Sequence, residues 1–379
     1  MSREYVELLQ SVLPDAGDYD LTRPFDELGV DSFDLLSIRV EFERVIGIEI
    51  PDSFWTEFRT FQDLFDYAHD AGPDSGATAA IPETIHGVHY ARDFELGMPQ
   101  MAIGALSEGW LFKELGNAHW ELLCRGLGTR SRDLADELGN RLYATFARVQ
   151  HVGNVNLAQF EESEPLRLTG EISRFGGGMY YSEFTLSAVA RPHVRIDARL
   201  ITSFSRRGET GNRGLVKSVP ATSTNAIANR AEAPAFIDEY RMVKKGSLNE
   251  VTVGSEHFSQ TDDVLHQSEY LLNPYHDLNG VGLLYFAAYP IISDTCEARY
   301  FNDRAGSMAG WWEQRWSAAS RDVMYYANCD IADTVVYRLH SLAESADKIS
   351  LAASLSRKSD NALMARIFVT KTRVSADLG

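Results

Sequence analysis

The chain has 379 residues, of which 44% are hydrophobic and 24% charged, a composition typical of globular rather than disordered proteins. At about 150 residues per domain, this length predicts two or three domains. The formal net charge is −18, and residues 1–70 alone hold 17 acidic against 5 basic side chains. Such an anionic segment disfavours nucleic acid as a partner and favours basic protein surfaces.

The cysteines and the hydropathy pattern bear on the compartment. Cys124, Cys296 and Cys329 fit neither a disulfide framework nor a metal-binding pair, so we expect a reducing cytoplasm and no metal site. The longest nearly unbroken apolar run, 281–292, is shorter than the roughly 20 residues that a membrane span needs. The N-terminal residues also lack the apolar core of a signal peptide, and no membrane association is expected.

The first 70 residues carry helical patterns around an Asp-Ser pair, Asp31-Ser32. After Ser32 an apolar stripe recurs at helical spacing, formed by Leu35, Ile38, Phe42 and Val45. Asp31 is suited to cap this helix, which would place the Ser32 hydroxyl at an exposed first turn. Amphipathic patterns also lie at 5–12 and 61–68, so we expect a small helical bundle over residues 1–70.

This segment resembles acyl carrier proteins over its whole length, with LGVDS, an amphipathic helix, GIEIPDSFW and a closing helix in that order. The resemblance implies a four-helix bundle whose Ser32 carries 4′-phosphopantetheine, attached by a phosphopantetheinyl transferase. Phe33 departs from the Leu or Met that usually follows this serine. A purely structural capping pair is the alternative. A protein with such an arm would handle acyl thioesters.

Residues 71–84 predict a linker, because AGPDSGATAA at its start is small, polar and without apolar periodicity. Beyond the linker, one pattern occurs twice: an apolar helix and then strand-like segments. The helices are expected at 97–123 and 275–301, and the halves at 85–220 and 221–379. Strands are expected at 140–150, 166–176, 180–190 and 193–204, and again at 321–331, 333–342, 348–358 and 361–374. The repeat predicts an α+β architecture in which each sheet wraps a helix, and two unrelated α+β domains are the alternative.

Several stretches of residues 85–374 resemble the LnmK-type bifunctional acyltransferase/decarboxylases and the Pnap-type biosynthetic family. They are GMPQMAIGALSEGWL, ELGNAHW, RLYATF, NPYHDLNGVGLLYFAAYP and SRDVMYYANCDIADTV. The resemblance implies a double hot-dog fold that binds acyl thioesters between its halves. It also implies that a tyrosine takes methylmalonyl from coenzyme A, and that the decarboxylated product passes to a carrier protein. Tyr143 matches that tyrosine by position, with Tyr180 and Tyr181 as nearby candidates.

Three further residues are candidates for this chemistry. Because a tyrosine ionises about 3 pH units above neutrality, it needs a base. His119 could serve, although a histidine on an apolar helix is more often a core residue. Decarboxylation leaves an enolate, which backbone donors at a helix start and the amide of Asn279 could stabilise. Asp277 begins a D-x-x-G pattern that resembles the catalytic carboxylate of hot-dog thioesterases, or else it caps a helix.

Our leading hypothesis is an acyl-CoA-dependent acyltransferase/decarboxylase that turns (methyl)malonyl-CoA into a short acyl group on Ser32, for a polyketide synthase or another assembly-line enzyme. Three alternatives remain. Asp277 keeps thioester hydrolysis open. DFELGMPQM is similar to a stretch of hot-dog dehydratases, but Asp93 stands where their catalytic histidine would be, and His89 lies four residues too early. The third alternative is an acyl-binding or docking domain without catalysis.

Overall fold

A computed structural model describes most of residues 9–374. Outside the description lie residues 1–8, 11–12, 14–19, 29, 31–33, 36–37, 40–41, 44–49, 51–54, 56, 71–87, 176–177, 222–225, 231–233, 306–311 and 375–379. Ser32 and the predicted linker 71–84 are therefore outside the described residues. Within the described part of the chain, no helix is long and apolar enough to cross a membrane.

The N-terminal segment ends with helix α4 (Phe61–Asp70), which confirms the predicted closing helix. Phe61, Leu64 and Phe65 of α4 are buried in a cluster that includes Ile38 and Phe42. The rings of Phe42 and Phe65 stack at 5.6 Å between centroids. Residues up to 70 thus have a hydrophobic core of their own. The helices expected before α4 lie largely outside the described residues, so the four-helix bundle remains a prediction.

The first half of the C-terminal part is an antiparallel sheet packed against helix α5 (Glu108–Gly126). Its strands follow the order β1-β5-β6-β7-β4. They are β1 (Val88–Glu95), β4 (Tyr143–Gly153), β5 (Pro165–Phe175), β6 (Met179–Ala188) and β7 (Arg195–Gly208). β4 to β7 confirm the four predicted strands, whereas β1 was not predicted. Two short strands extend this sheet: β8 (Gly211–Lys217) pairs with β7, and β9 (Ala228–Asn229) pairs with β5.

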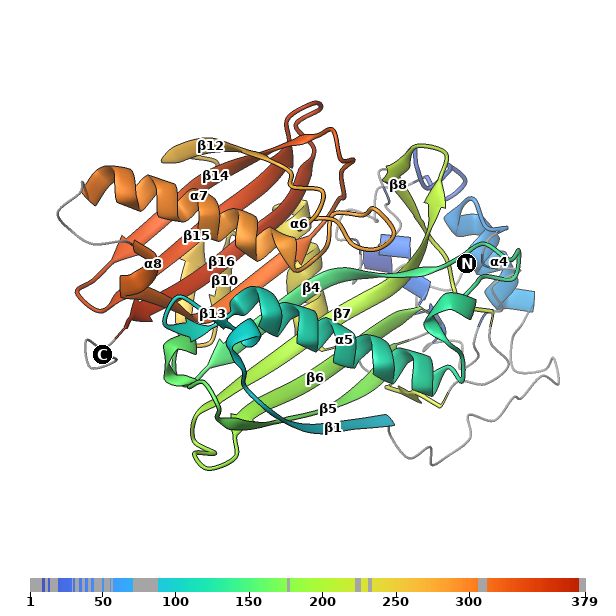
Figure 1. Cartoon of the computed structure of the whole chain (residues 1–379). Coiled ribbons are helices and arrows are strands. Elements are labelled where there is room, and N and C mark those ends of the chain that lie inside the picture. Colours follow the sequence, from blue (N-terminus) through green and yellow to red (C-terminus); the bar gives the residue numbers. More distant parts are fainter. Residues whose placement is uncertain are drawn as a thin grey trace.

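The second half repeats this topology around helix α7 (Ala288–Ala305), in the order β13-β16-β15-β14-β12. Its strands are β12 (His266–Leu271), β13 (Trp316–Tyr325), β14 (Thr334–Glu344), β15 (Lys348–Arg357) and β16 (Leu363–Arg373), with a short helix α8 (Trp312–Arg315) before β13. The elements β12, α7 and β13 to β16 correspond in order to β1, α5 and β4 to β7. This correspondence confirms the internal repeat. Because β13 also pairs with β4, the halves form one 12-stranded sheet with α5 and α7 on the same face (Figure 1).

Both central helices begin later than the apolar spacing predicted, at Glu108 instead of 97 and at Ala288 instead of 275. The segment before α5 instead forms a turn, η2 (Met98–Gln100), and a small hairpin of β2 (Met101–Ala102) and β3 (Ala105–Leu106). Gly104 and Gly282 have φ of 65° and 78°, a backbone conformation that ends helices and favours glycine. The Ser107 side chain then caps α5 by accepting the Trp110 N–H. The remaining short turns are η3 (Ser131–Asp133) and η4 (Leu157–Gln159).

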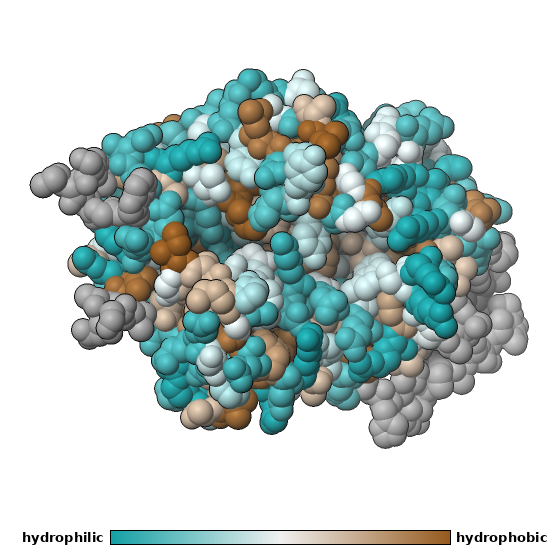
Figure 2. Space-filling view, viewed as in Figure 1, coloured by the Kyte–Doolittle hydropathy of each residue, from teal (hydrophilic) through white to brown (hydrophobic). Residues whose placement is uncertain are grey.

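The opposite face of the sheet is covered by a segment between the halves that the sequence did not predict. It consists of helix α6 (Ala235–Lys245) and a hairpin of β10 (Glu250–Val253) and β11 (Glu256–Ser259), which lie behind the sheet in Figure 1. Phe236, Tyr240 and Val243 of α6 are buried against sheet residues such as Met324 and Phe368. The sheet therefore has a hydrophobic core on each face. The outer surface above α5 and α7 is mostly hydrophilic, with hydrophobic residues in small separate groups (Figure 2).

Two successive residues of β13 hold buried ion pairs on opposite faces of the sheet. Arg321 donates to both carboxylate oxygens of Glu108 on α5, at 2.7 and 2.9 Å, and to Asp294 on α7 at 2.6 Å. On the α6 face, Asp322 accepts from Arg148 of β4 at 2.6 and 3.0 Å. The side chains of Arg148, Asp322 and Arg321 have 0% exposure. Removing one partner of such a pair is costly because it leaves a buried charge unpaired.

We expect Arg321→Met to lower the free energy of unfolding by about 3 to 5 kcal/mol, because it leaves Glu108 buried without its cation. Arg195→Met is the matched control, since the Arg195–Asp197 pair is about half exposed and such pairs contribute at most about 1 kcal/mol. Urea titration of both variants measures the difference. Equal effects in the two variants would contradict a stabilising role for the Arg321 pair.

Glu108 also predicts a pH dependence. Burial alone would raise the pKa of Glu108, but the charge of Arg321 and the hydrogen bond from His151 outweigh it and hold the pKa below its ordinary value. A depressed carboxyl pKa stabilises the folded state above the unfolded pKa of about 4.3, and this contribution is lost as the pH falls. Between about pH 5 and pH 3, stability should fall more steeply in the wild type than in Arg321→Met. Urea titrations at several pH values test this, and parallel profiles would refute it.

Candidate functional site

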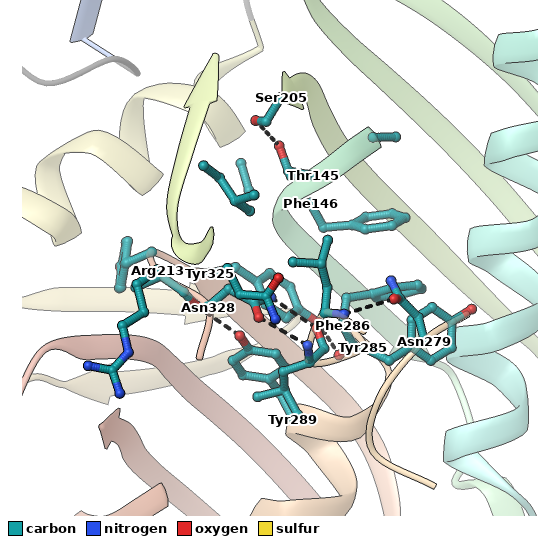
Figure 3. A pocket seen from close by; sticks show the side chains of 18 of the residues that line it. Thr145, Phe146, Ser205, Arg213, Asn279, Tyr285, Phe286, Tyr289, Tyr325 and Asn328 are labelled. Atoms are coloured by element: carbon teal, nitrogen blue, oxygen red, sulfur yellow. Dashed lines mark hydrogen bonds between the residues drawn. The ribbon is translucent and has the colours of Figure 1, made fainter. Parts of the chain in front are cut away.

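A cavity of about 230 Å³ lies where the pairing between β4 and β13 ends (Figure 3). The two strands pair only from Arg148–Met324 to Val152–Ser320. Residues 144–147 of β4, Tyr325 at the end of β13 and residues 326–328 after it border the cavity instead. The other lining residues come from β7, β8, α6, the loop before α7 and the start of α7: Ser205, Asn212, Arg213, Leu215, Lys217, Tyr240, Lys244, Asn279, Leu283, Leu284, Tyr285, Phe286 and Tyr289. Both halves and both faces of the sheet therefore contribute to the cavity.

Aromatic side chains form one wall of the cavity. Phe146 of β4 stacks on Phe286 with 3.8 Å between ring centroids. The Tyr325 hydroxyl donates to the Phe286 carbonyl at 3.1 Å, and the Tyr289 hydroxyl donates to the Ala327 carbonyl at 2.8 Å. Burial raises the pKa of both tyrosines well above its ordinary value, so they stay protonated. These hydroxyls tie α7 and the loop before it to the end of β13 and the loop after it, all within the second half. The Phe146–Phe286 stack is the contact at this wall that joins the two halves.

Asn279 lines the cavity with an amide whose oxygen is already engaged. Its oxygen accepts the N–H groups of Val281 at 3.1 Å and Leu283 at 3.0 Å, which fixes the amide in the loop before α7. The Nδ2 hydrogens have no partner among the described residues. Asn328 differs, because its oxygen accepts the Leu284 N–H and its nitrogen donates to the Leu284 carbonyl, both at 3.0 Å. Asn279 is thus a preset donor, and Asn328 is a structural tie.

A hydrogen-bonded chain of hydroxyls and a lysine lies on the strands of the first half. Lys217 Nζ donates to the Thr145 hydroxyl at 3.0 Å and also to the Ser203 hydroxyl. The hydroxyl oxygens of Thr145 and Ser205 are 2.9 Å apart (Figure 3). Thr145 faces Ser203 across the β4–β7 pairing, and Ser205 faces Lys217 across the β7–β8 pairing. The sequence analysis missed this group. Its only signal was the polar side chains at alternating positions of otherwise apolar strands.

Of the predicted residues, Asn279 lines the cavity and Tyr143 lies close to it. Tyr143 is half-buried and, two residues before Thr145, shares its face of β4. The guanidinium groups of Arg141 and Arg207 lie 5.5 and 5.7 Å from the Tyr143 ring centre. Arg207 also donates to the carbonyl of Val281, in the loop that carries Asn279. Tyr143 therefore sits beside this loop but is not one of the residues that line the cavity.

His119 lies outside the cavity, in the core of the first half. Its ring nitrogens are 2.7 Å from the hydroxyls of Ser182 and Thr202, so both are satisfied. Burial lowers the pKa of His119 to about 3, which keeps the imidazole neutral. This placement fits the core interpretation and leaves His119 without access to a substrate in the cavity.

Asp277 is also buried away from the cavity. Its carboxylate accepts the Asn273 N–H at 2.7 Å and lies 3.0 Å from the His276 ring nitrogen. Its carbonyl accepts the Tyr285 N–H at 2.8 Å. Because α7 begins only at Ala288, Asp277 does not cap that helix as the sequence pattern suggested. It fastens the loop that presents Asn279.

The remaining candidates from the sequence also lie apart from the cavity. Tyr180 is buried against Phe204 in the first half, and the Tyr181 hydroxyl donates to Glu183 at 2.8 Å. Burial raises the pKa of Tyr181, which disfavours its use as a nucleophile. Asp93 is exposed and forms an ion pair with Arg167 at 2.7 Å. An exposed, paired carboxylate outside the cavity does not fit the role of a dehydratase's catalytic base. Among the described residues, no group of three or more His, Cys, Asp or Glu side chains is arranged to hold a metal ion.

A second cavity, of about 220 Å³, lies at the other end of the β4–β13 pairing. It is lined by the loop before α5, the start of β13 and the end of β16, the counterparts of elements around the first cavity. Three of its four charged residues are held in ion pairs: Glu108 with Arg321, and Asp294 with both Arg321 and Lys371. The fourth, Glu313, accepts from the Asn302 amide. We call the β4–β13 pairing the seam between the halves. The cavities at its two ends thus differ in the chemical groups that line them.

Comparison with known proteins agrees with both parts of the chain. Residues 6–68 match the family described as phosphopantetheine attachment site. A 12:0-ACP thioesterase from Umbellularia californica superposes with a TM-score of 0.52 at 10% identity, covering 76% of this chain and 95% of that one. A putative oleoyl thioesterase from Lactobacillus plantarum superposes with a TM-score of 0.54 at 13% identity, covering 77% and 100%.

Identities this low show a shared fold only. The matches confirm the expected carrier segment and the hot-dog fold, while the likeness to LnmK-type enzymes rests on the sequence stretches alone. The chain joins an N-terminal phosphopantetheine-attachment domain to a repeated hot-dog fold similar to that of acyl-ACP thioesterases.

Proposed function

We propose that the protein is an acyl-CoA-dependent acyltransferase/decarboxylase of polyketide-type biosynthesis. It would convert a malonyl or methylmalonyl thioester into a short acyl group carried by phosphopantetheine on Ser32. The observation that carries this proposal is the set of polar residues in the cavity lining, which comprises amides, hydroxyls and the cationic residues Lys217 and Lys244. Arg213 also lines the cavity, but its guanidinium is paired with Asp330 and Asp333. The described lining residues include no Asp, Glu, His or Cys. Such a lining favours anionic ligands.

Decarboxylation of a malonyl thioester suits these groups. The bond between the α-carbon and the carboxylate breaks, carbon dioxide leaves, and the electron pair moves into the thioester as an enolate. A proton then adds to the α-carbon. The substrate carboxylate and the enolate oxygen are both anions, and preset donors such as Asn279 Nδ2 stabilise a developing oxyanion without reorganisation. The reaction needs no base to start it.

Hydrolysis is the second candidate, because both similar structures are thioesterases by name. Activation of water calls for a general base within hydrogen-bond reach. Asp277 and His119, the bases considered from the sequence, do not line the cavity. The volume of about 230 Å³ is also below the 300 to 1,000 Å³ usual for ligand sites. A short acyl group fits such a space better than a 12-carbon chain.

The acyl group needs an acceptor between coenzyme A and the arm. Tyr143 remains our proposed nucleophile, since cationic Arg141 and Arg207 flank its ring and would stabilise negative charge there. Thr145 is the competing acceptor within the cavity, because a lysine next to a hydroxyl is a known way to activate it. Transfer to the arm in the same chain would replace a diffusional encounter by a tethered one.

The first test is intact mass spectrometry of phosphopantetheinylated protein mixed with malonyl-CoA or methylmalonyl-CoA. We expect acetyl or propionyl on the arm, and a loss of about 10²- to 10³-fold in rate for Asn279→Ala, which removes one oxyanion donor. The exposed Asn249→Ala is the matched control. A carboxylated adduct that persists would refute decarboxylation, and release of free acid without an adduct would favour the thioesterase.

The second test identifies the nucleophile. Ser32→Ala removes the attachment serine, so an acyl group taken from coenzyme A should remain on the hot-dog part. In this background we expect Tyr143→Phe to abolish the adduct and Thr145→Val to retain it, because Val keeps the shape but lacks the hydroxyl. Peptide mapping locates the modified residue. An adduct on Thr145, or an unchanged adduct in Tyr143→Phe, would show that Tyr143 is the wrong assignment.

A further inference from the structure

We propose that helix α6 is the docking site for the carrier domain of the same chain, and that an ion pair between Lys245 and Asp34 positions this domain at the cavity. What the docked arm delivers or collects rests on the proposed function, but the docking itself does not.

α6 is anchored firmly enough to serve as a platform. Phe236, Ile237, Tyr240 and Val243 form its buried face against the sheet. Arg148, which joins β4 to β13, also donates to the Phe236 carbonyl at 2.7 Å and stacks 3.9 Å from the Phe236 ring centre. The helix ends at Gly246 with φ of 70°. Its orientation is therefore tied to the same seam that borders the cavity.

The last turn of α6 joins the carrier domain to the cavity through adjacent lysines. Lys245 Nζ lies 3.2 Å from Asp34 Oδ1, and the Asp34 side chain is only 5% exposed. Lys244, the preceding residue, lines the cavity and lies 6.0 Å from the Tyr326 ring centre. Asp34 follows the predicted attachment residue Ser32 by two positions. One basic turn thus contacts the carrier domain through Lys245 and lines the cavity through Lys244.

Charge and covalent linkage favour this arrangement. Residues 1–70 hold 17 acidic and 5 basic side chains, whereas the last turn of α6 is basic and its C-terminal dipole is complemented by cations. Opposite charges orient two surfaces more than they strengthen their affinity. Because the partners share one chain, the effective concentration is high and a weak contact suffices. α6 belongs to the segment between the two halves, outside the repeated elements.

Zero-length carbodiimide cross-linking of the full-length phosphopantetheinylated protein tests the contact without relying on activity. This reagent joins an amine to a carboxylate that touches it, so we expect an amide between Lys245 and Asp34 within monomers. Lys245→Arg keeps the charge but should lose this link. The Lys358–Glu269 pair, 2.7 Å apart, is the internal control for the chemistry. A control link without the Lys245 link, or a Lys245 link only between two molecules, would overturn the proposal.

A charge swap tests whether the contact matters for transfer. We expect Lys245→Glu to slow loading of the protein's own arm by at least about tenfold, and Asp34→Lys in the same chain to restore most of the rate. Lys113→Glu, an exposed residue of α5, is the matched control and should load normally. Equal loading by Lys245→Glu and the control would refute the positioning role. If the cross-link forms but no variant decarboxylates, the docking stands and the proposed function fails.

Discussion

The short pairing of β4 with β13 is the contact on which the rest of this structure depends. It converts two repeated halves into one sheet, yet it comprises only the pairs between 148–152 and 320–324. Neighbouring residues of a strand point to opposite faces, so Arg321 meets α5 and α7 while Asp322 meets Arg148 on the α6 side. A slip of one residue would place each charge on the wrong face, without a partner. Buried ion pairs of this kind specify the register more than they add net stability.

The same short pairing creates the space for chemistry. Strands that paired along their whole length would fill the region between residues 144–147 and 325–328 with backbone hydrogen bonds. Here the strands separate instead, and the gap is bordered by polar side chains of the first half and by the loop before α7. Asp277 stabilises that loop from the inside, so a residue that resembles a catalytic acid in the sequence acts on the geometry of Asn279. At the opposite end, the equivalent space holds Glu108 and Asp294, whose charges are already matched by cations.

The sequence predicted the elements whose pattern is local. Alternating apolar residues indicated β4 to β7 and β14 to β16, and the repeat itself was visible as a helix followed by strands. The starts of α5 and α7 were wrong, because apolar residues at helical spacing around Gly104 and Gly282 lie in turns that positive φ angles impose. α6 was missed although its buried residues Phe236, Ile237, Tyr240 and Val243 recur at helical spacing, because the prediction rested on the two repeats and α6 lies between them. Lys217, Thr145 and Ser203 are far apart in sequence and meet only through strand register.

The divergence of the two ends of the seam has a consequence for stoichiometry. In a homodimer of single hot-dog units, symmetry would make both ends identical, and any substitution that shaped one site would appear in the other. Fusion of the halves into one chain removes that constraint, so one end carries charges matched in ion pairs and the other carries polar groups around an open space. Within this sequence, the phosphopantetheine-attachment domain of residues 6–68 is thus joined to one cavity of this polar kind among the described residues, a one-to-one ratio of arm to cavity.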